Sequence, residues 1–314
     1  MQRYTHSGIV PASGAVSTVL CGLTAAVVGG VAYAFLAYWL SWGLVRMILM
    51  VVYGLGVGLA IGVAANKGKI RSPLFNTVVA LVCVAIGLWV YWGAYDVARN
   101  GMQVAGRAWT PQGLSAHAAD LFENGSFSLK GGGRGKLDEW PLVIGWFLEG
   151  ICVTGLVVSM SRQDAARPFC ETCQQWTSDT GGLIFVAADG QEPAWQEVLG
   201  GDLTAIAVFA PTDPIASPHV RLDLASCPAC QHSNFVTLSS VTIKRDSKGK
   251  EKKSERALIR NGAITDPEAA FLRQFAKQLH GEEAPDEAGN EDEDWDDVTG
   301  DEPENKATDQ RNEA

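Results

Sequence analysis

A single uninterrupted apolar segment constrains the fold of this chain more than any other feature. From Leu44 to Ala64 the chain runs for 21 residues with Arg46 as the only charged side chain. A helix of this length spans about 31 Å, which matches the hydrocarbon thickness of a bilayer. The loop that follows, 66–73, carries three cations and no acid, and such loops usually stay in the cytoplasm. The segment therefore predicts a membrane helix that ends on the cytoplasmic side.

Three further segments, 15–40, 74–95 and 141–160, are apolar and long enough to cross a bilayer. The first is too long for the core of a cleaved signal peptide. The expected fold class is a four-helix transmembrane bundle followed by a small soluble α+β domain. The expected parts of the membrane region are a cytoplasmic segment at 1–14, three membrane helices within 15–95, an external loop at 96–140 and the fourth helix at 141–160.

Small residues give the second apolar segment one smooth face. Gly54, Gly58 and Gly62 recur at every fourth position, so a neighbouring helix can approach the backbone closely. In the first segment two pairs, Ala25/Gly29 and Ala26/Gly30, have the same spacing and are the expected partners of this face. The glycine faces could alternatively join two copies of the chain in a homo-oligomer.

Aromatic and basic side chains predict how the helices are oriented. In an antiparallel array one interface would hold the aromatic residues Tyr38, Trp39, Trp42, Trp89, Tyr91, Trp92, Tyr95, Trp140 and Trp146. The opposite interface would hold the 66–73 loop together with Arg162 and Arg167. Because cations favour the cytoplasmic side, both termini are expected in the cytoplasm.

The 96–140 loop contains two local patterns. Leu114, Ala118, Leu121 and Phe122 have helical spacing, which favours a short amphipathic helix on the membrane surface. The glycine-rich stretch 130–137 lacks the first glycine and the final serine or threonine of a phosphate-binding loop. It is therefore interpreted as a turn.

After Met160 the pattern changes to short strands and charged connections. The expected elements are strands at 183–187, 220–224 and 235–244, a charged connection at 246–255 and a helix at 266–280. Asp266 is the expected N-cap of that helix, with Pro267 at its first position. The period of 203–209 fits either a helix or a strand.

Charge is distributed unevenly along the chain. The net charge is −10, but 281–314 alone carries 15 acids and two cations, so the remaining chain is slightly basic. The segment 282–314 contains too few apolar residues to form a core and is expected to be disordered. The basic run at 244–256 lacks aromatic residues and is diluted by acids, so nucleic acid is not an expected partner.

Four of the seven cysteines form the strongest local motif. Two residues separate Cys170 from Cys173, and two separate Cys227 from Cys230. Such pairs supply four thiolates for a structural Zn²⁺ ion in a reducing compartment. The 53 residues between the pairs exceed the usual spacing, but the entropy of loop closure grows only logarithmically with length. Residues 161–281 are therefore predicted to form a cytoplasmic zinc-ribbon-like domain.

Other interpretations of the cysteines stay open. A thioredoxin-like centre needs one Cys-x-x-Cys at a helix start after a strand, which neither pair fits well. His219 or His232 could replace one thiolate, although four cysteines already satisfy the metal. A site with four protein ligands has no open coordination position, which favours a structural role over hydrolysis.

Glu149 lies near the middle of the fourth apolar segment, where an ionised carboxylate is costly. Arg46, near the outer end of the second segment, is a candidate partner, and Asn76 lies near the inner end of the third. One interpretation is a structural ion pair or a neutral, hydrogen-bonded acid. The alternative is a transport path in which Glu149 carries protons or ions.

Three motifs give the chain a resemblance to known sequences. They are Tyr4-x-x-Ser7-Gly8, Pro168-Phe169-Cys170-Glu171-x-Cys173-x-x-Trp176 and Leu222-Asp223-Leu224-x-x-Cys227-Pro228-x-Cys230. With these motifs the chain resembles a group of uncharacterised bacterial four-span membrane proteins with a C-terminal four-cysteine domain, over most of residues 4–280. The resemblance implies the same architecture in the inner membrane of a bacterium, and it implies no activity.

The leading functional hypothesis is a non-enzymatic membrane protein whose cytoplasmic zinc domain docks another protein. One alternative is a small transporter or channel subunit with Glu149 on the transport path. This alternative requires an oligomer, because four membrane helices with one buried acid are few for a monomeric transporter. A membrane-tethered thiol oxidoreductase is the third hypothesis.

Overall fold

The computed structural model describes residues 1–314 except 41, 125–138, 188–191, 213–216, 246–250 and 281–314. The glycine-rich turn at 130–137 and the acidic segment at 282–314 are predictions that lie outside the described residues. The same holds for the first half of the charged connection at 246–255.

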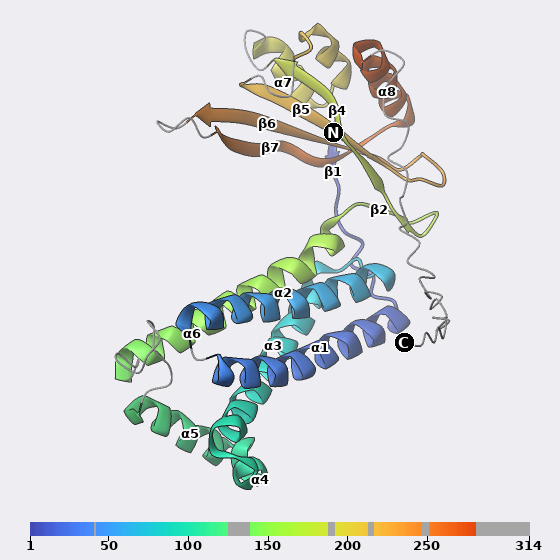
Figure 1. Ribbon diagram of the computed structural model, residues 1–314. Helices are drawn as coiled ribbons and strands as arrows, with labels where there is room; N and C mark the ends of the chain where they lie inside the picture. Colours follow the sequence, from blue (N-terminus) through green and yellow to red (C-terminus); the bar gives the residue numbers. More distant parts are fainter. Residues whose placement is uncertain (41, 125–138, 188–191, 213–216, 246–250, 281–314) are drawn as a thin grey trace, which may run out of the picture.

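Among the described residues, four helices are long and apolar enough to cross a membrane. They are α1 (Ala12–Trp39), α2 (Gly43–Lys67), α3 (Pro73–Asn100) and α6 (Glu139–Gln163). Both α1 and α6 pack against α2 and α3, which gives the helical bundle in the lower part of Figure 1. Large apolar side chains such as Val28, Leu44 and Phe147 stay exposed on the outside of the bundle, as expected for helices that face lipid.

The glycine face of α2 packs against α6, not against α1. A Cβ added at Gly54 would lie 3.2 Å from Leu156 Cδ1, and one added at Gly58 would lie 2.8 Å from Met160 Cβ. Gly62 is buried on the same helix. The expected pairing of this face with the two small-residue pairs of α1 is therefore wrong, because the last helix of the bundle occupies it. A homo-oligomer stays a prediction and would need another surface.

Two tyrosines assigned to the aromatic interface point into the bundle instead. Tyr91 and Tyr95 are buried, whereas Trp39, Trp42 and Trp140 are exposed at the same end of the bundle. Tyr91 stacks on Tyr33 of α1 with ring centroids 4.6 Å apart. Hydropathy could not separate the buried tyrosines from the exposed tryptophans, since an aromatic ring near a helix end suits either a lipid interface or a contact between helices.

Short helices close the far end of the bundle. They are η1 (Met102–Val104), α4 (Ala105–Ala108) and α5 (Pro111–Asn124). The predicted amphipathic helix is α5, and its Leu121 is buried against the bundle. His117 of α5 lies buried beside Asp96 of α3, with 3.1 Å between Nδ1 and Oδ1. Burial lowers the pKa of His117, and the neighbouring carboxylate opposes this shift.

The second part of the molecule is an antiparallel sheet with the strand order β1-β7-β6-β5-β4 over the described residues. The strands are β1 (Gln2–Arg3), β4 (Ser178–Ala187), β5 (His219–Ser226), β6 (Asn234–Arg245) and β7 (Glu251–Ile264). One face is covered by α7 (Glu192–Gly200), η3 (Leu203–Val208) and α8 (Asp266–His280). Leu222 and Leu238 pair in register on this face and pack with Ile206 and Leu272.

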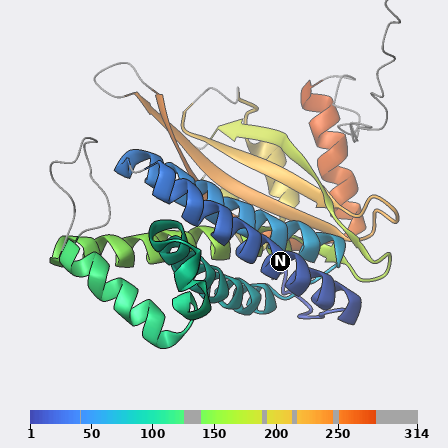
Figure 2. The ribbon, with the colours of Figure 1, turned by 60° about the horizontal axis from the view of Figure 1, so that its bottom comes forward.

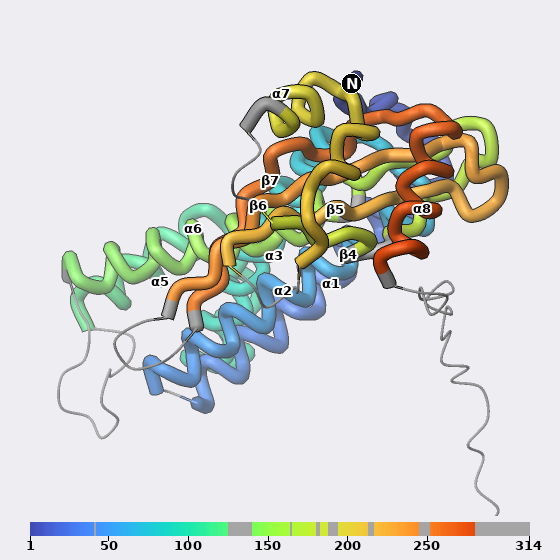
Figure 3. The backbone as a smooth tube through the Cα atoms, turned by 90° about the horizontal axis from the view of Figure 1, so that it is seen from above, coloured from blue at the N-terminus to red at the C-terminus, as the bar shows by residue number. Residues whose placement is uncertain are grey.

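The opposite face of the sheet is polar and turned towards the bundle. Figures 2 and 3 show α8 and the bundle on opposite sides of the sheet. Because side chains alternate along a strand, Arg221 and Asp223 lie on this second face of β5. The N-terminal segment links the two parts, since Tyr4 N–H donates to the Asn261 carbonyl and Arg71 N–H donates to the Ile9 carbonyl.

Three details of this domain differ from expectation. β7 begins at Glu251 inside the expected charged connection, because pairing with β6 extends a strand through exposed, charged residues. The ambiguous segment at 203–209 is mostly the 3₁₀ helix η3. The N-cap of α8 is Thr265, not Asp266: the Thr265 backbone N–H and hydroxyl both donate to Glu268 Oε2, at 2.7 and 2.8 Å.

Candidate metal centre

Each Cys-x-x-Cys pair lies on a tight turn between two strands. Cys170 ends β2 (Phe169–Cys170), and Cys173 lies in the turn that leads to β3 (Gln175–Trp176). Cys227 follows β5, and Cys230 lies in the turn before β6. The residue after each pair is a glutamine with positive φ, 54° at Gln174 and 56° at Gln231. We call these two turns the first and the second knuckle.

The two knuckles bring all four thiols together. The Sγ atoms of Cys170, Cys173, Cys227 and Cys230 lie within 4.8 Å of one another, and the Cys170–Cys230 distance is 3.8 Å. A disulfide would require about 2.05 Å. Zinc–sulfur bonds of about 2.3 Å in a tetrahedron place sulfur atoms about 3.8 Å apart. The thiol cluster therefore has the dimensions of a four-coordinate metal site.

Hydrogen bonds favour the thiolate form of Cys170. The Ser233 hydroxyl donates to Cys170 Sγ at 3.2 Å. Burial raises the pKa of this thiol, but the bonds from Ser233, from the Cys173 backbone and from the other thiols outweigh burial and lower the pKa to about 6. Because metals bind the thiolate, this environment suits a thiolate ligand.

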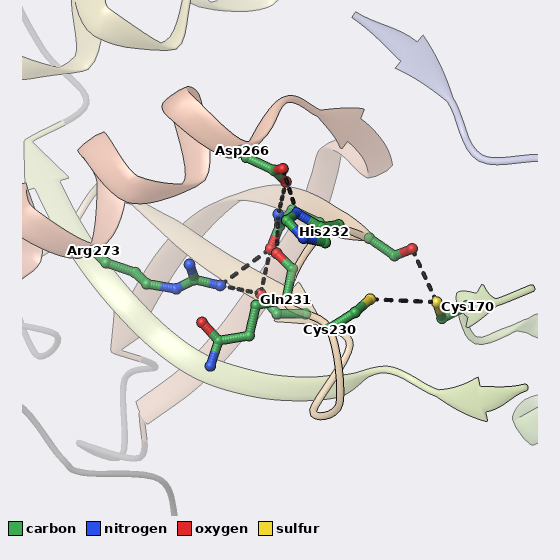
Figure 4. Close-up of polar contacts among 9 residues, drawn as sticks. Cys170, Cys230, Gln231, His232, Asp266 and Arg273 are labelled. Atoms are coloured by element: carbon green, nitrogen blue, oxygen red, sulfur yellow. Dashed lines mark hydrogen bonds and ion pairs between the residues drawn. The ribbon is translucent and has the colours of Figure 1, made fainter. Parts of the chain in front are cut away.

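A polar network holds the second knuckle in shape (Figure 4). The Asn234 side chain donates to the Gln231 carbonyl at 2.7 Å and to Asp266 at 3.0 Å. Arg273 of α8 donates to Ser226 at 2.7 Å and to Asn234 Oδ1 at 3.1 Å. The start of α8 and the second knuckle are thereby fixed to each other, independently of any metal.

The first knuckle docks on the α2–α3 loop of the bundle. The guanidinium of Arg71 forms an ion pair with Glu171, and its carbon atom lies 4.3 Å from the centre of the Phe169 ring. The Trp176 indole donates to the Asn66 carbonyl at 3.1 Å. That carbonyl lies in the last turn of α2 and also accepts a hydrogen bond from the Lys69 backbone N–H at 3.0 Å. Two of the candidate metal ligands and the contacts with the bundle therefore lie on one short hairpin.

Neither histidine considered as a replacement ligand joins the cluster. His232 Nδ1 lies 2.6 Å from Asp266 Oδ2. His219 is buried at the opposite end of β5, where its ring packs on Phe185 with centroids 5.8 Å apart. The candidate ligands are the four cysteines.

The polar residues of the bundle form a second centre. Arg46 and Glu149 are paired at 3.4 Å. Glu149 also accepts a hydrogen bond of 2.6 Å from the Tyr33 hydroxyl, and Arg46 donates to Tyr91. A cavity of about 390 Å³ between α2 and α6 reaches this pair.

Asn76 is not part of this second centre. Its amide donates to the Ser161 carbonyl at 2.8 Å, at the end of α6 that leads into the sheet domain. Its Oδ1 has no hydrogen-bond partner within the described part of the chain. Asn76 therefore joins α3 to α6 near the junction.

Sequence reasoning missed Tyr33, Tyr91 and Arg71. The two tyrosines carried no signal beyond an apolar helix with aromatic residues. Arg71 was counted only as a cytoplasmic cation, and its partner Glu171 lies 100 residues further along the chain. The Pro168–Trp176 motif marked the right hairpin without indicating its partner.

No protein-family model, no curated protein and no solved structure matches this chain. The resemblance to bacterial four-span membrane proteins therefore stays a prediction. The four candidate membrane helices and the thiol cluster are consistent with it.

Proposed function

We propose that this chain is a non-enzymatic protein of the bacterial inner membrane whose cytoplasmic domain docks another protein and is held in place by structural zinc. The observation that carries the proposal is the position of the thiol cluster. The first knuckle contributes two thiols and contacts Arg71 of the bundle, whereas the second contributes two thiols and belongs to the sheet. An ion bound to both knuckles would join the two parts.

Zinc fits the donor set better than other common ions. Four thiolates at tetrahedral spacing suit a soft or borderline cation, and calcium or magnesium would require oxygen ligands. Four protein ligands also leave no position for a reacting water molecule, which supports a structural role. A redox pair would need two thiols set apart from the others, and all four converge here.

The outer edge of β7 is the best candidate surface for the partner. In the described chain the N-terminal segment pairs only with the end of β7, from Asn261 to Ala263, so the outer backbone groups of residues 251–260 face no further strand. A groove of about 460 Å³ beside this edge is lined by the exposed residues Leu199 and Leu258. An extended segment of a partner can add a strand to such an edge and place apolar side chains in the groove.

Cross-linking in native membranes tests the docking proposal. Leu258→Glu places a charge in the groove and should remove the cross-linked partner while zinc content stays unchanged. Lys252→Gln, an exposed change on the same strand, is the control and should retain the partner. A partner that is retained equally by all three proteins would contradict docking at this edge.

The orientation of the protein in the membrane is tested by replacing two exposed serines with cysteine and labelling the new thiols. Ser115 lies on α5, next to the bundle, and Ser254 lies on β7 of the sheet domain. With both termini in the cytoplasm, Ser115→Cys should react with an impermeant thiol reagent in intact cells, and Ser254→Cys should react only after permeabilisation. The reverse pattern would invert the topology.

A transporter or channel subunit is the second candidate function. It is favoured by one observation, the cavity of about 390 Å³ that reaches the Arg46–Glu149 pair within the bundle. Intramembrane charges that border a cavity often mark ion paths. Under this alternative, Glu149→Gln would keep the protein stable and abolish its cellular role, measured by complementation of a deletion strain.

A further inference from the structure

A polar cleft separates the end of α6 from the uncovered face of the sheet. Its volume is about 540 Å³. The bundle contributes Ser159, Arg162 and Gln163 from the last turns of α6, and the sheet contributes Asp223, Thr237 and Arg260 among others. The cleft is distinct from the thiol cluster and from the Arg46–Glu149 pair.

Three guanidinium groups line this cleft, from Arg162, Arg167 and Arg260. Within the described part of the chain, the side chains of Arg162 and Arg260 form no ion pair and no hydrogen bond, and the guanidinium of Arg167 donates only to the Thr177 carbonyl, at 3.3 Å. Other arginines of the molecule differ in this respect. Arg46 and Arg71, for example, are each paired with a carboxylate.

The lining of the cleft holds two carboxylates, Asp179 and Asp223, against three guanidinium groups. Asp223 is buried and bound to Arg221 at 2.9 Å, and Arg221 also reaches Glu255 at 3.0 Å. Asp179, the second carboxylate of the lining, interacts electrostatically with Arg167. The cleft therefore presents an excess of guanidinium groups.

The position of the cleft matches the depth of lipid headgroups. Arg162 lies in the last turn of a candidate membrane helix, one residue from its end at Gln163. A lipid phosphate lies at this depth when the helix crosses the bilayer. Guanidinium groups bind phosphate oxygens through paired, charge-assisted hydrogen bonds.

We propose that this cleft binds the phosphate of an anionic phospholipid through Arg162, Arg167 and Arg260. The neighbouring Thr237 and Gln163 offer hydrogen-bonding groups to the rest of the headgroup. The bound lipid would join the end of α6 to the sheet, in addition to the contact that Arg71 makes with Glu171. The proposal needs the membrane assignment and does not depend on zinc.

The test uses the full chain in nanodiscs of phosphatidylcholine with increasing fractions of phosphatidylglycerol, followed by thermal unfolding. Phosphatidylglycerol should raise the unfolding temperature of the wild type in a saturable manner. Arg162→Gln and Arg260→Gln should each raise the half-saturating fraction about tenfold, the value expected for one charge-assisted contact. Arg256→Gln, an exposed change on β7 outside the cleft, is the matched control and should behave like the wild type.

Two further arms decide the source of the phosphate. Inorganic phosphate or glycerol 3-phosphate, added to pure phosphatidylcholine discs, should have no saturable effect at millimolar concentration. An effect that equals that of phosphatidylglycerol would assign the cleft to a soluble ligand and overturn the lipid proposal. An equal response of the wild type and all three variants to phosphatidylglycerol would overturn it as well.

A conservative variant keeps the test decisive if Arg260→Gln does not fold. Arg260→Lys retains the charge but loses the planar pair of donors. If Arg260→Lys needs a larger half-saturating fraction of phosphatidylglycerol than the wild type, the contact between Arg260 and the lipid phosphate is supported. An unchanged fraction overturns it.

Discussion

The Arg46–Glu149 pair and the thiol cluster are two polar centres of the molecule, but only the first contains groups of opposite charge. The guanidinium and the carboxylate sum to zero, and the hydroxyl groups of Tyr33 and Tyr91 add hydrogen bonds. The thiols have no basic side chain in hydrogen-bonding contact within the described residues. Four thiolates repel one another unless a cation lies between them.

This difference indicates that the bundle is electrostatically complete on its own and that the junction is not. The pair connects α1, α2, α3 and α6 with side chains alone. Under the zinc proposal, an added ion would connect the two knuckles at the junction. Substitutions in the two centres should therefore have effects of different size and different dependence on metal.

The largest effect is expected for Cys170→Ser. This change removes a ligand from the cluster, and structural zinc contributes on the order of 10–16 kcal/mol in zinc-finger peptides. Zinc content should fall from one per chain towards zero, and hydrogen exchange of 169–176 should accelerate strongly. Core amides of the sheet should stay protected, because the apolar core between the sheet, α7 and α8 contains no knuckle residue.

Cys21→Ser is the control for this experiment, since Cys21 lies exposed on α1, away from the cluster. It should leave zinc content and exchange unchanged. Normal zinc content and slow exchange in Cys170→Ser would show that the cluster is not a metal site.

The next largest effect is a loss of bundle stability when the Arg46–Glu149 pair is broken. Glu149→Leu leaves Arg46 buried without its carboxylate and should destabilise the bundle by about 3–5 kcal/mol. Glu149→Gln keeps an acceptor for Tyr33 and should cost only about 1–2 kcal/mol. Unfolding in detergent measures both values, and chelation should change neither. Equal stability of the two variants would mean that the acceptor retained by Gln contributes nothing to the stability of the bundle.

The sequence predicts features that depend on nearby residues and misses those that depend on distant ones. The helix α2 follows from 21 consecutive residues, and the knuckles follow from two-residue spacings. The contact between Arg71 and Glu171 joins residues 100 positions apart, so no local pattern contains it. Likewise, α6 covers the glycine face of α2 because of how the helices pack, which spacing alone does not determine.

The strand β7 was missed for a related physical reason. Its first half carries exposed, charged residues such as Lys252 and Lys253, which is typical of a solvated connection. Backbone pairing with β6 makes this segment a strand even though neither face is apolar. Such strands carry little hydrophobic signal in the sequence.

A smaller change in bundle stability is expected for substitutions at the contact between α2 and α6. A Cβ at Gly58 would lie 2.8 Å from Met160 Cβ and 3.1 Å from Val157 Cα, so Gly58→Ala should destabilise the bundle by about 1–3 kcal/mol. At Gly56 no atom lies within 4 Å of an added Cβ, and Gly56→Ala should be neutral or stabilising by up to about 1 kcal/mol. Unfolding in detergent measures both. A neutral Gly58→Ala would contradict the close packing of these helices.

The smallest effect is expected for Trp176→Phe at the junction. The change keeps an aromatic ring and removes the indole donor to Asn66, which should cost about 1 kcal/mol. The loss should appear as faster exchange in the first knuckle. Trp39→Phe, at an exposed ring without this contact, should have no such effect. A loss of zinc in Trp176→Phe would show that docking and metal binding are one event.

Metal analysis combined with X-ray absorption on the full chain, purified under reducing conditions, tests the central claim most directly. The account predicts one zinc per chain, surrounded by four sulfur atoms at about 2.3 Å. Chelation should then accelerate hydrogen exchange at the knuckles without changing it in the bundle. A metal-free chain with four titratable thiols and a protected first knuckle would contradict the claim that zinc joins the sheet to the bundle.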